Sequence, residues 1–210
     1  MARKPRLGRR VRSDLRDRIL DAALRLAEVD GWNNLRLQRV ADELGVPLTA
    51  VRREYRDRDA LADEWFRRAE EAMLAAVAGD FRARPPKDRI LALFDAWFDA
   101  VAPRRRVTVE MLRTKLYASH PHHWVPMAFN LSRLIQWVRD AAAFPADGRR
   151  RQIEEIGLTA IFLLALGVWS NDATPGRNRT RTILERALSA ADRGMARLFG
   201  GGRKKGRRSG

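Results

Sequence analysis

The sequence of 210 residues contains no cysteine, which excludes disulfides, thiol catalysis and cysteine-ligated metals. Its three histidines, His120, His122 and His123, lie together with no carboxylate beside them, although metal sites need several ligands in a fixed geometry. The sequence also lacks a glycine-rich phosphate loop, a Ser/His/Asp arrangement and paired carboxylates in an apolar run. We therefore expect no metal, no cofactor and no enzymatic activity.

Acidic residues are scarce relative to basic ones. The chain has 42 Lys plus Arg against 26 Asp plus Glu, a formal net charge of +16. This balance favours an anionic partner, either nucleic acid or a membrane surface, although an arginine-rich chain can also reflect a GC-rich genome. Residues 1–12 carry six basic residues and no acidic one. We expect this segment and the basic tail 200–210 to be disordered, the first as a DNA-contacting arm or a solubilising tail.

Long hydrophobic runs are missing as well. The longest uncharged stretch of the apolar segment 152–170 is the 16 residues between Glu155 and Asp172, shorter than the ~20 residues of a membrane-spanning helix. No apolar segment follows the N-terminal charges, so no secretory signal is predicted. We expect a soluble, cytoplasmic protein in which 152–170 is a buried helix.

The stretch from Leu37 to Tyr55 is the most informative. Its first half places apolar residues at helical spacing on one face, at Leu37, Val40, Ala41 and Leu44. Gly45 follows as a helix end and Pro47 as a helix start. In the second half Val51 and Tyr55 face inward, which leaves an outer face of Leu48, Thr49, Arg52, Arg53 and Arg56. Two short helices with outward arginines predict either a DNA-reading helix-turn-helix or an ordinary helical hairpin.

Helical signals continue on both sides of this stretch. We expect a preceding helix from Ser13 or Asp14 to about Asp30, a helix cap at Asn33 or Asn34, and an N-cap at Asp57 for the following helix. The Pro85-Pro86 pair marks a break, and the histidines are expected in a loop before a helix that ends near Phe144. The predicted fold is all-α. The expected ranges are a basic arm (1–12), a helix-turn-helix domain (13–60), a larger helical domain (61–199) and a basic tail (200–210).

Large and soft side chains are dense in the larger domain. They either line a pocket for an apolar or aromatic ligand or simply fill a core. The candidates are Phe94, Trp97, Met111, Trp124, Met127 and Trp137.

The last two predicted helices, 152–170 and 178–199, carry an apolar surface rich in small residues. A monomer would leave such a surface exposed, so we expect a homodimer through these helices. The candidate interface residues are Ile161, Ala165, Leu184 and Leu188.

Residues 18–65 resemble the N-terminal domain of the TetR family of bacterial regulators. The resemblance rests on residues 18–24 (RILDAAL), Gly31 with the aromatic Trp32, Val40-Ala41, Gly45-Val46, Tyr55 and Ala60-Leu61. It implies a three-helix DNA-binding head, a larger helical domain with a ligand pocket, and a dimer with a four-helix interface. The implied partners are double-stranded DNA, a small apolar or aromatic ligand and a second copy of the chain. The implied function is a transcriptional regulator, most simply a repressor.

The chain departs from the family pattern at several positions of the head. Leu35 and Arg36 stand where the family usually has Thr or Ser, Pro47-Leu48 where it has Ser-Lys, Arg52 where it has Tyr, and Glu54 is unusual in the reading helix. The expected DNA-contacting residues are Arg36, Leu48, Thr49, Arg52, Arg53 and Arg58.

A looser resemblance leads to a different function. The pair Gly31-Trp32 and the segment 166–172 (LGVWSND) are similar to TetR-fold accessory proteins of ubiquinone biosynthesis. That resemblance implies a lipid- or quinone-binding protein acting at a membrane surface. Such proteins usually end in an amphipathic helix, whereas this chain ends in a charged tail, so the regulator is the preferred interpretation.

Overall fold

The computed structural model describes residues 7–115, 121–144 and 148–199, and the side chains of 14–115, 130–144 and 148–199. Within these ranges every regular element is a helix, which confirms the all-α prediction. The α-helices are α1 (Leu7–Asp30), α2 (Leu37–Leu44), α3 (Leu48–Glu54), α4 (Arg58–Ala75), α5 (Pro86–Val101), α6 (Arg105–Lys115), α7 (Pro121–Ala141), α8 (Gly148–Trp169) and α9 (Asn178–Phe199). Short 3₁₀ turns lie at η1 (Trp32–Asn34), η2 (Phe81–Ala83), η3 (Ala102–Arg104) and η4 (Pro175–Arg177).

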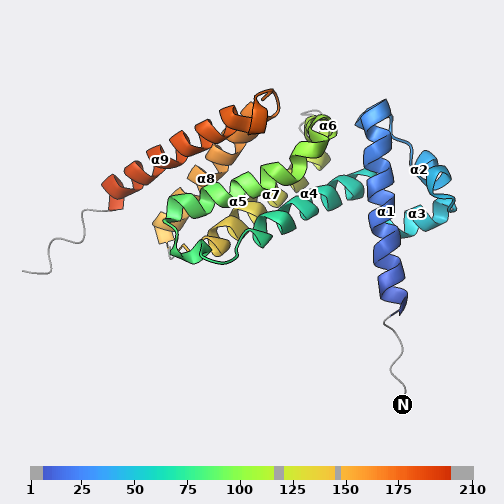
Figure 1. Ribbon diagram of the computed structural model, residues 1–210, viewed down its shortest axis with the longest axis horizontal. Coiled ribbons are helices and arrows are strands. Elements are labelled where there is room, and N and C mark those ends of the chain that lie inside the picture. The colour runs from blue at the N-terminus through green and yellow to red at the C-terminus, as the bar shows by residue number, and fades with distance from the viewer. Residues whose placement is uncertain (1–6, 116–120, 145–147, 200–210) are drawn as a thin grey trace, which may run out of the picture. The chain divides into compact units, whose positions relative to one another are not determined.

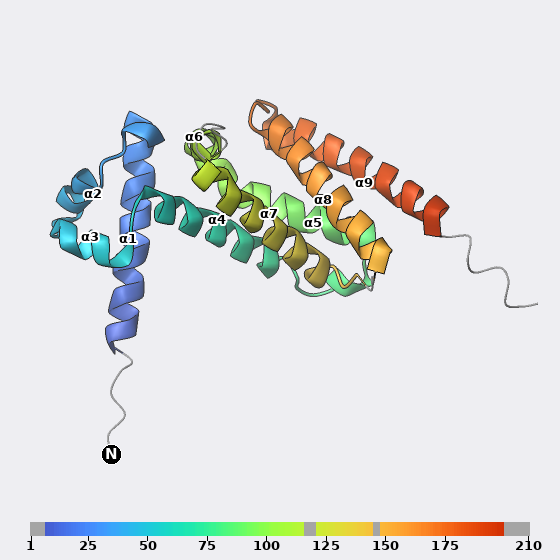
Figure 2. The same cartoon turned by 180° about the vertical axis from the view of Figure 1, so that it is seen from behind.

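The chain divides into two compact units that differ from the expected domain ranges. The first unit comprises Met1–Glu71 and Asp99–Val125, and the second comprises Ala72–Phe98 and Pro126–Gly210. Helix α6 therefore belongs with the N-terminal helices, because it packs against α1 and η1. In the first unit, α2 and α3 lie on one side of α1 (Figures 1 and 2).

Helix α1 starts earlier than the sequence predicts. Its backbone is helical from Leu7, so the prediction of a disordered arm is wrong for residues 7–12, while residues 1–6 lie outside the described part of the chain. Arginine is a good helix former, and the stable helix that follows lets the turn propagate backwards. Further along, Ile19, Ala23 and Ala27 are fully buried, as their helical spacing predicts.

The corner after α1 is held by α6. Gly31 adopts φ 87°, a conformation that favours glycine, and the next residue, Trp32, is buried. The Trp32 backbone N–H donates to Glu110 Oε2 at 2.6 Å, and Thr114 Oγ1 donates to Asn33 Oδ1 at 3.0 Å. The predicted cap at Asn33 or Asn34 is wrong, since Arg36 is the N-cap residue of α2.

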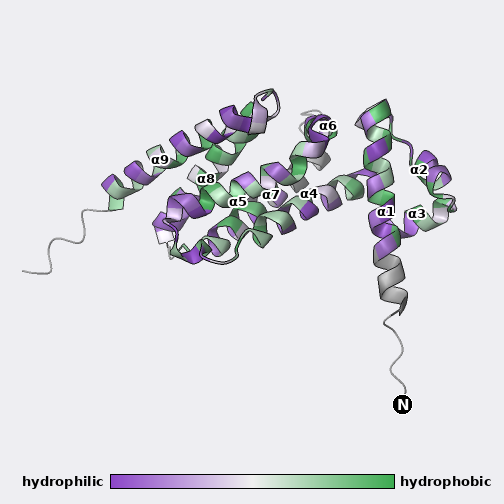
Figure 3. Cartoon of the chain, viewed as in Figure 1, coloured by the Kyte–Doolittle hydropathy of each residue, from purple (hydrophilic) through white to green (hydrophobic). Residues whose placement is uncertain are grey.

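The second unit is built on an aromatic core. Phe162 of α8 packs against three rings of α5, with centroid distances of 5.3 Å to Phe94, 5.0 Å to Trp97 and 5.6 Å to Phe98. Trp169 contacts Phe98 at 5.7 Å. Helices α8 and α9 lie side by side, and Figure 3 shows the hydrophobic stretch of α8 beside an α9 that alternates between polar and apolar residues.

A buried carboxylate joins α8 to α9. Asp172 accepts hydrogen bonds from the backbone N–H and hydroxyl of Thr180, at 2.8 and 2.6 Å, and from the hydroxyl of Thr174. Burial opposes ionisation, but these hydrogen bonds outweigh it and hold the Asp172 pKa well below its usual range. The predicted last helix 178–199 is confirmed.

Two further expectations concern α7 and α8. The backbone is already helical from Pro121, so the histidine loop is shorter than predicted, because proline suits a first helical turn. His120 and the side chains of His122 and His123 lie outside the described part of the chain. Helix α8 is the one described helix long and apolar enough to cross a bilayer. Only 22% of its most apolar window is buried in the single chain, so the prediction of a buried helix is wrong for most of this window.

Candidate nucleic-acid interface

The α2–α3 turn has the backbone expected of a helix-turn-helix. Gly45 adopts φ 65° and ψ 31°, the left-handed conformation that ends α2. The Val46 N–H donates to Ala41 O at 3.0 Å, which closes the turn. Pro47 is the N-cap residue of α3, so the helix begins at Leu48, one position after the predicted start at Pro47. The Ala50 N–H donates to the Pro47 carbonyl at 2.8 Å.

Helix α3 has a buried and an open face. Val51 and Tyr55 are 0% and 1% exposed and point into the first unit, as predicted. Four of the six predicted DNA contacts share the opposite, solvent-exposed face: Leu48, Thr49, Arg52 and Arg53. Within the described residues neither Arg52 nor Arg53 has an ion-pair partner, so both guanidinium groups are available to a ligand. This face offers two bidentate donors, a hydroxyl and an apolar contact, which suits base edges and phosphates in a major groove.

The other two predicted contacts lie elsewhere. Arg36 is exposed at the start of α2, and no side chain caps this helix. The missing cap agrees with the sequence, in which Arg36 stands where the family usually has a residue with a hydroxyl group. Arg58 is half-buried at the start of α4, and its Nη1 donates to Asn33 O at 2.7 Å and Trp32 O at 3.3 Å. The guanidinium of Arg58 therefore already braces η1. Asp57 caps α4 as predicted, since its Oδ1 accepts from the Ala60 N–H at 2.8 Å.

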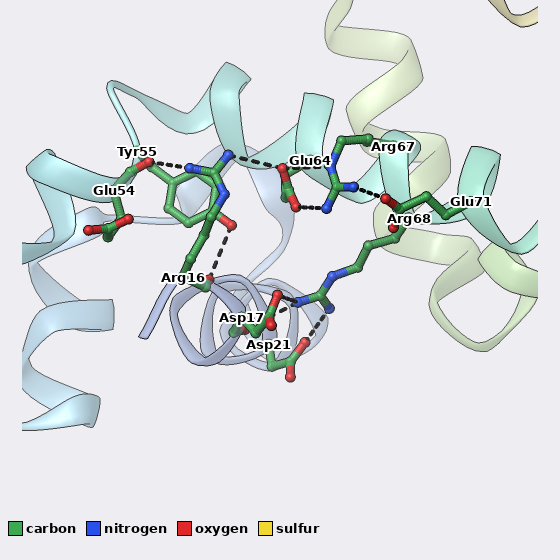
Figure 4. Close-up of polar contacts among 9 residues, drawn as sticks. All are labelled: Arg16, Asp17, Asp21, Glu54, Tyr55, Glu64, Arg67, Arg68 and Glu71. Carbon is green, nitrogen blue, oxygen red and sulfur yellow. Dashed lines mark hydrogen bonds and ion pairs between the residues drawn. The ribbon is translucent and has the colours of Figure 1, made fainter. Parts of the chain in front are cut away.

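A charged network that the sequence analysis missed holds the far end of α3. Arg16 of α1 donates from Nη1 to the carbonyl of Glu54 at 2.7 Å and from Nη2 to Glu64 Oε2 of α4 at 2.9 Å. Its guanidinium carbon lies 4.4 Å from the centre of the Tyr55 ring, and the Tyr55 hydroxyl donates to the Arg16 carbonyl at 3.1 Å. Figure 4 shows the Glu54 carboxylate pointing away from Arg16.

The network continues along α4. Glu64 is 5% exposed and is also bound by Arg67, whose guanidinium reaches Glu71 as well. These hydrogen bonds, from Arg67 first and Arg16 second, overcome burial and lower the pKa of Glu64 to about 2. Burial raises the pKa of Tyr55, which keeps its hydroxyl protonated. The spacing of Glu64, Arg67 and Glu71 could have revealed the helical part, but no sequence signal links Arg16 to α4.

The predicted ligand residues do not form one group. Phe94 and Trp97 lie in the aromatic core of the second unit, and Met111 is buried in the first unit. Trp137 of α7 is 51% exposed, and the side chains of Trp124 and Met127 lie outside the described residues. A cavity of about 210 Å³ lies between α7 and α8, lined by Leu131, Ser132, Ile135, Glu155 and Thr159. It contains none of the predicted residues.

The predicted interface residues are interior ones. Ile161, Ala165, Leu184 and Leu188 are between 0% and 8% exposed in the single chain, where α8 packs on α9. The opposite face of α8 is apolar and open, with Ile153, Ile156, Leu163 and Leu164 between 41% and 70% exposed. A β-carbon added at Gly157 or Gly167 would meet no atom within 4 Å. Ile153, Ile156 and Leu163 are separated by three and seven residues, and Leu164 lies beside Leu163, so the four exposed side chains form a single stripe along α8.

The residues whose side chains are described contain no group of three or more potential metal ligands. The histidine cluster falls outside them, so the expectation that it binds no metal stays a prediction.

Comparison with known structures identifies the class of fold. The chain is similar to the crystal structure of a TetR transcriptional regulator from Nitrosomonas europaea ATCC 19718, with 36% sequence identity, a TM-score of 0.77, and 85% of this chain and 98% of that chain covered. It is also similar to a TetR transcriptional regulator from Rhodococcus sp. RHA1, with 18% identity, a TM-score of 0.62, and 88% and 97% covered. A third similar structure is the TetR family transcriptional regulator PfmR from Thermus thermophilus, with 16% identity, a TM-score of 0.54, and 82% and 97% covered. No protein-family model and no curated protein matches the sequence.

The fold and the open face of α3 define a helix-turn-helix protein of the transcription-regulator class. The first similarity extends over nearly the whole of the related chain at 36% identity. The chain belongs to the TetR family of transcriptional regulators, which confirms the resemblance found in its sequence; the two more distant structures support the fold alone.

Proposed function

We propose that the chain is a repressor that binds a near-palindromic operator as a homodimer, through the open face of α3. The observation that carries the proposal is the pair of exposed guanidinium groups, Arg52 and Arg53, beside Leu48 and Thr49 on a helix whose other face is buried. An exposed arginine can bind guanine O6 and N7 with both branches, a common specific contact in the major groove. A cytoplasmic location follows from such a role.

The dimer in this proposal uses the exposed stripe of α8 rather than the buried residues between α8 and α9. Ile156 and Leu164 are 70% and 52% exposed, and a single chain gains nothing by leaving such residues in water. The small Gly157 and Gly167 on this side allow a second helix to approach closely. Two copies would place their reading helices in half-sites about one helical turn apart.

An apolar or aromatic ligand bound in the second unit would release the operator. The support is the concentration of aromatic side chains around Phe94 and Trp97, which a ligand could partly displace. Release requires that the ligand bind one conformation more tightly, namely the one whose spacing of the two heads no longer matches successive major grooves. The lipid-binding alternative has no such support, because the similar protein with 36% identity is a transcriptional regulator.

Selection from a random duplex pool tests the operator proposal. The wild-type protein is expected to enrich one palindromic sequence at physiological salt. Replacing the arginine that reaches a guanine by alanine should cost about 1–3 kcal/mol of binding free energy and relax specificity at one base pair per half-site. Arg82→Ala, at an exposed arginine of η2 in the second unit, removes the same charge from outside both the reading helix and the exposed stripe of α8, and should leave specificity unchanged. Enrichment of no sequence would remove the repressor assignment.

A further inference from the structure

The reading helix needs an external support at its C-terminal end. Helix α3 has seven residues, which is too short to be stable on its own, and the last carbonyls of any helix lack partners within it. Arg52 and Arg53 lie in the last turn of α3. The direction in which these side chains leave the protein therefore depends on whatever fixes the carbonyl of Glu54, the last residue of the helix.

Arg16 supplies this support from a different helix. One branch of its guanidinium, Nη1, binds the Glu54 carbonyl at 2.7 Å, while the other, Nη2, binds Glu64 of α4 at 2.9 Å. The same guanidinium lies over the ring of Tyr55, the residue that ends α3. A single planar group thus joins α1, α3 and α4 (Figure 4). A planar fork holds two acceptors in a fixed geometry, which a lysine cannot do.

The carboxylate that orients Arg16 is itself fixed. Glu64 is 5% exposed and accepts two hydrogen bonds from Arg67, one of them at 3.1 Å, in addition to that from Arg16. Arg67 is in turn paired with Glu71 one turn further along α4. A displacement of α4, which carries Glu64, Arg67 and Glu71, would therefore move the Arg16 guanidinium that binds the Glu54 carbonyl at the end of α3.

We propose that Arg16 is a positioning residue for DNA reading, which sets the orientation of Arg52 and Arg53 by joining the C-terminal end of α3 to Glu64 of α4. The role rests on the proposed operator binding, because it concerns how the open face of α3 meets base edges. Arg16 acts through α3 and has no contact with the DNA of its own.

The chain offers a matched control in Arg68. This arginine also joins α4 to α1, through Asp17 at 2.9 Å and Asp21 at 2.7 Å, but within the described residues none of its bonds reaches α3. Arg16→Ala and Arg68→Ala each remove one guanidinium and an α1–α4 link. Only the first removes the support of the reading helix.

The first measurement needs no DNA. Hydrogen exchange of the free full-length protein is followed at the amides of residues 52–55. Arg16→Ala should accelerate their exchange about tenfold, the effect of losing one charge-assisted hydrogen bond, and Arg68→Ala should not. Equal acceleration in the two variants, or none in Arg16→Ala, overturns the proposal. If Arg16→Ala does not fold, Arg16→Lys, which keeps the charge without the fork, should show the same acceleration to a smaller degree, and an unchanged rate overturns the proposal.

The second measurement uses the DNA fragment selected by the wild-type protein and an unrelated fragment of the same length. Arg16→Ala should weaken binding of the selected fragment about tenfold and of the unrelated fragment much less, with an unchanged salt dependence. Equal weakening on both fragments, with a log–log salt slope reduced by about one per site, would show a direct phosphate contact and contradict the proposal. If the wild-type protein selects no fragment, the operator function fails, and the exchange measurement still decides whether Arg16 positions α3.

Discussion

The contacts that join α1, α3 and α4 in the first unit differ in kind from those that join α5 to α8 in the second, although each unit has both an apolar core and ion pairs. In the first unit the helices are joined by charged and polar groups at their edges, such as Arg16 with Glu64, Arg68 with Asp17 and Asp21, and Glu110 with the backbone of η1. In the second unit α5 and α8 are joined by stacked and edge-on aromatic rings around Phe162. Aromatic burial resists salt and acid, whereas ion pairs between helices depend on both.

This difference in contacts agrees with the lengths of the helices in the two units. Helices α2 and α3 have eight and seven residues and bury few large side chains, so directional bonds must set their orientation. The long helices α8 and α9 have 22 residues each and align through extended packing. A short helix whose orientation is set by a few bonds can be re-oriented at a small cost in free energy. This property suits the operator release proposed above.

The largest expected effect comes from breaking the aromatic core. Phe162→Ala removes a ring that is 3% exposed and contacts three others, and should lower the free energy of unfolding by about 3–5 kcal/mol. Denaturant unfolding followed by circular dichroism measures it. Phe199→Ala, at an exposed phenylalanine of α9, should change stability by less than about 0.5 kcal/mol. A similar small cost for both would mean that the ring cluster contributes little.

The next effect tests the open stripe of α8. Leu164→Arg places a charge where the second copy is proposed to pack, and should convert the dimer to monomers in light scattering, because a buried unpaired charge costs several kcal/mol. Val29→Arg introduces the same side chain at an 80% exposed site of α1 and should leave the mass unchanged. A Leu164→Arg dimer as stable as the wild type would place the interface elsewhere.

The sequence predicts the packing faces of the helices better than it predicts the polar bonds between them. Helix spacing, Gly45 and Pro47 predict the helix-turn-helix and the buried faces, because those depend on local periodicity. The early start of α1 and the corner at η1 were mispredicted, since tertiary context decided both. Arg16, Glu64 and Glu110 could not be found, because residues 48 and 78 positions apart meet only once the fold exists. The family resemblance indicated a dimer through the last two helices, but the sequence could not separate their inner from their outer apolar face.

A smaller effect distinguishes the units by pH. The Glu64 pKa is lowered from 4.5 to about 2, so its contribution to stability is present above pH 4.5 and is lost as the pH falls towards 2. The hydrogen-exchange protection factors of amides near Arg16 and Glu64 should therefore fall over that range before those of the ring cluster around Phe162 do. Glu64→Gln, which has no charge to lose, should flatten this pH dependence. An unchanged profile in that variant would assign the acid sensitivity to other carboxylates.

The smallest change in the free energy of unfolding is expected on replacing Arg68, and it is the sharpest test of the contrast between polar and aromatic contacts. Its partners Asp17 and Asp21 are 56% and 53% exposed, and exposed ion pairs contribute only ~0.2–1 kcal/mol because water and salt screen them. Arg68→Ala should thus lower the free energy of unfolding by no more than about 1 kcal/mol, and less at 0.5 M than at 0.05 M salt. Unfolding in urea at the two ionic strengths measures both quantities. A loss of several kcal/mol that salt does not reduce would mean that the α1–α4 contact relies on the packed stem of Arg68, and the contrast between the polar contacts of α1, α3 and α4 and the aromatic contacts of α5 and α8 would not hold.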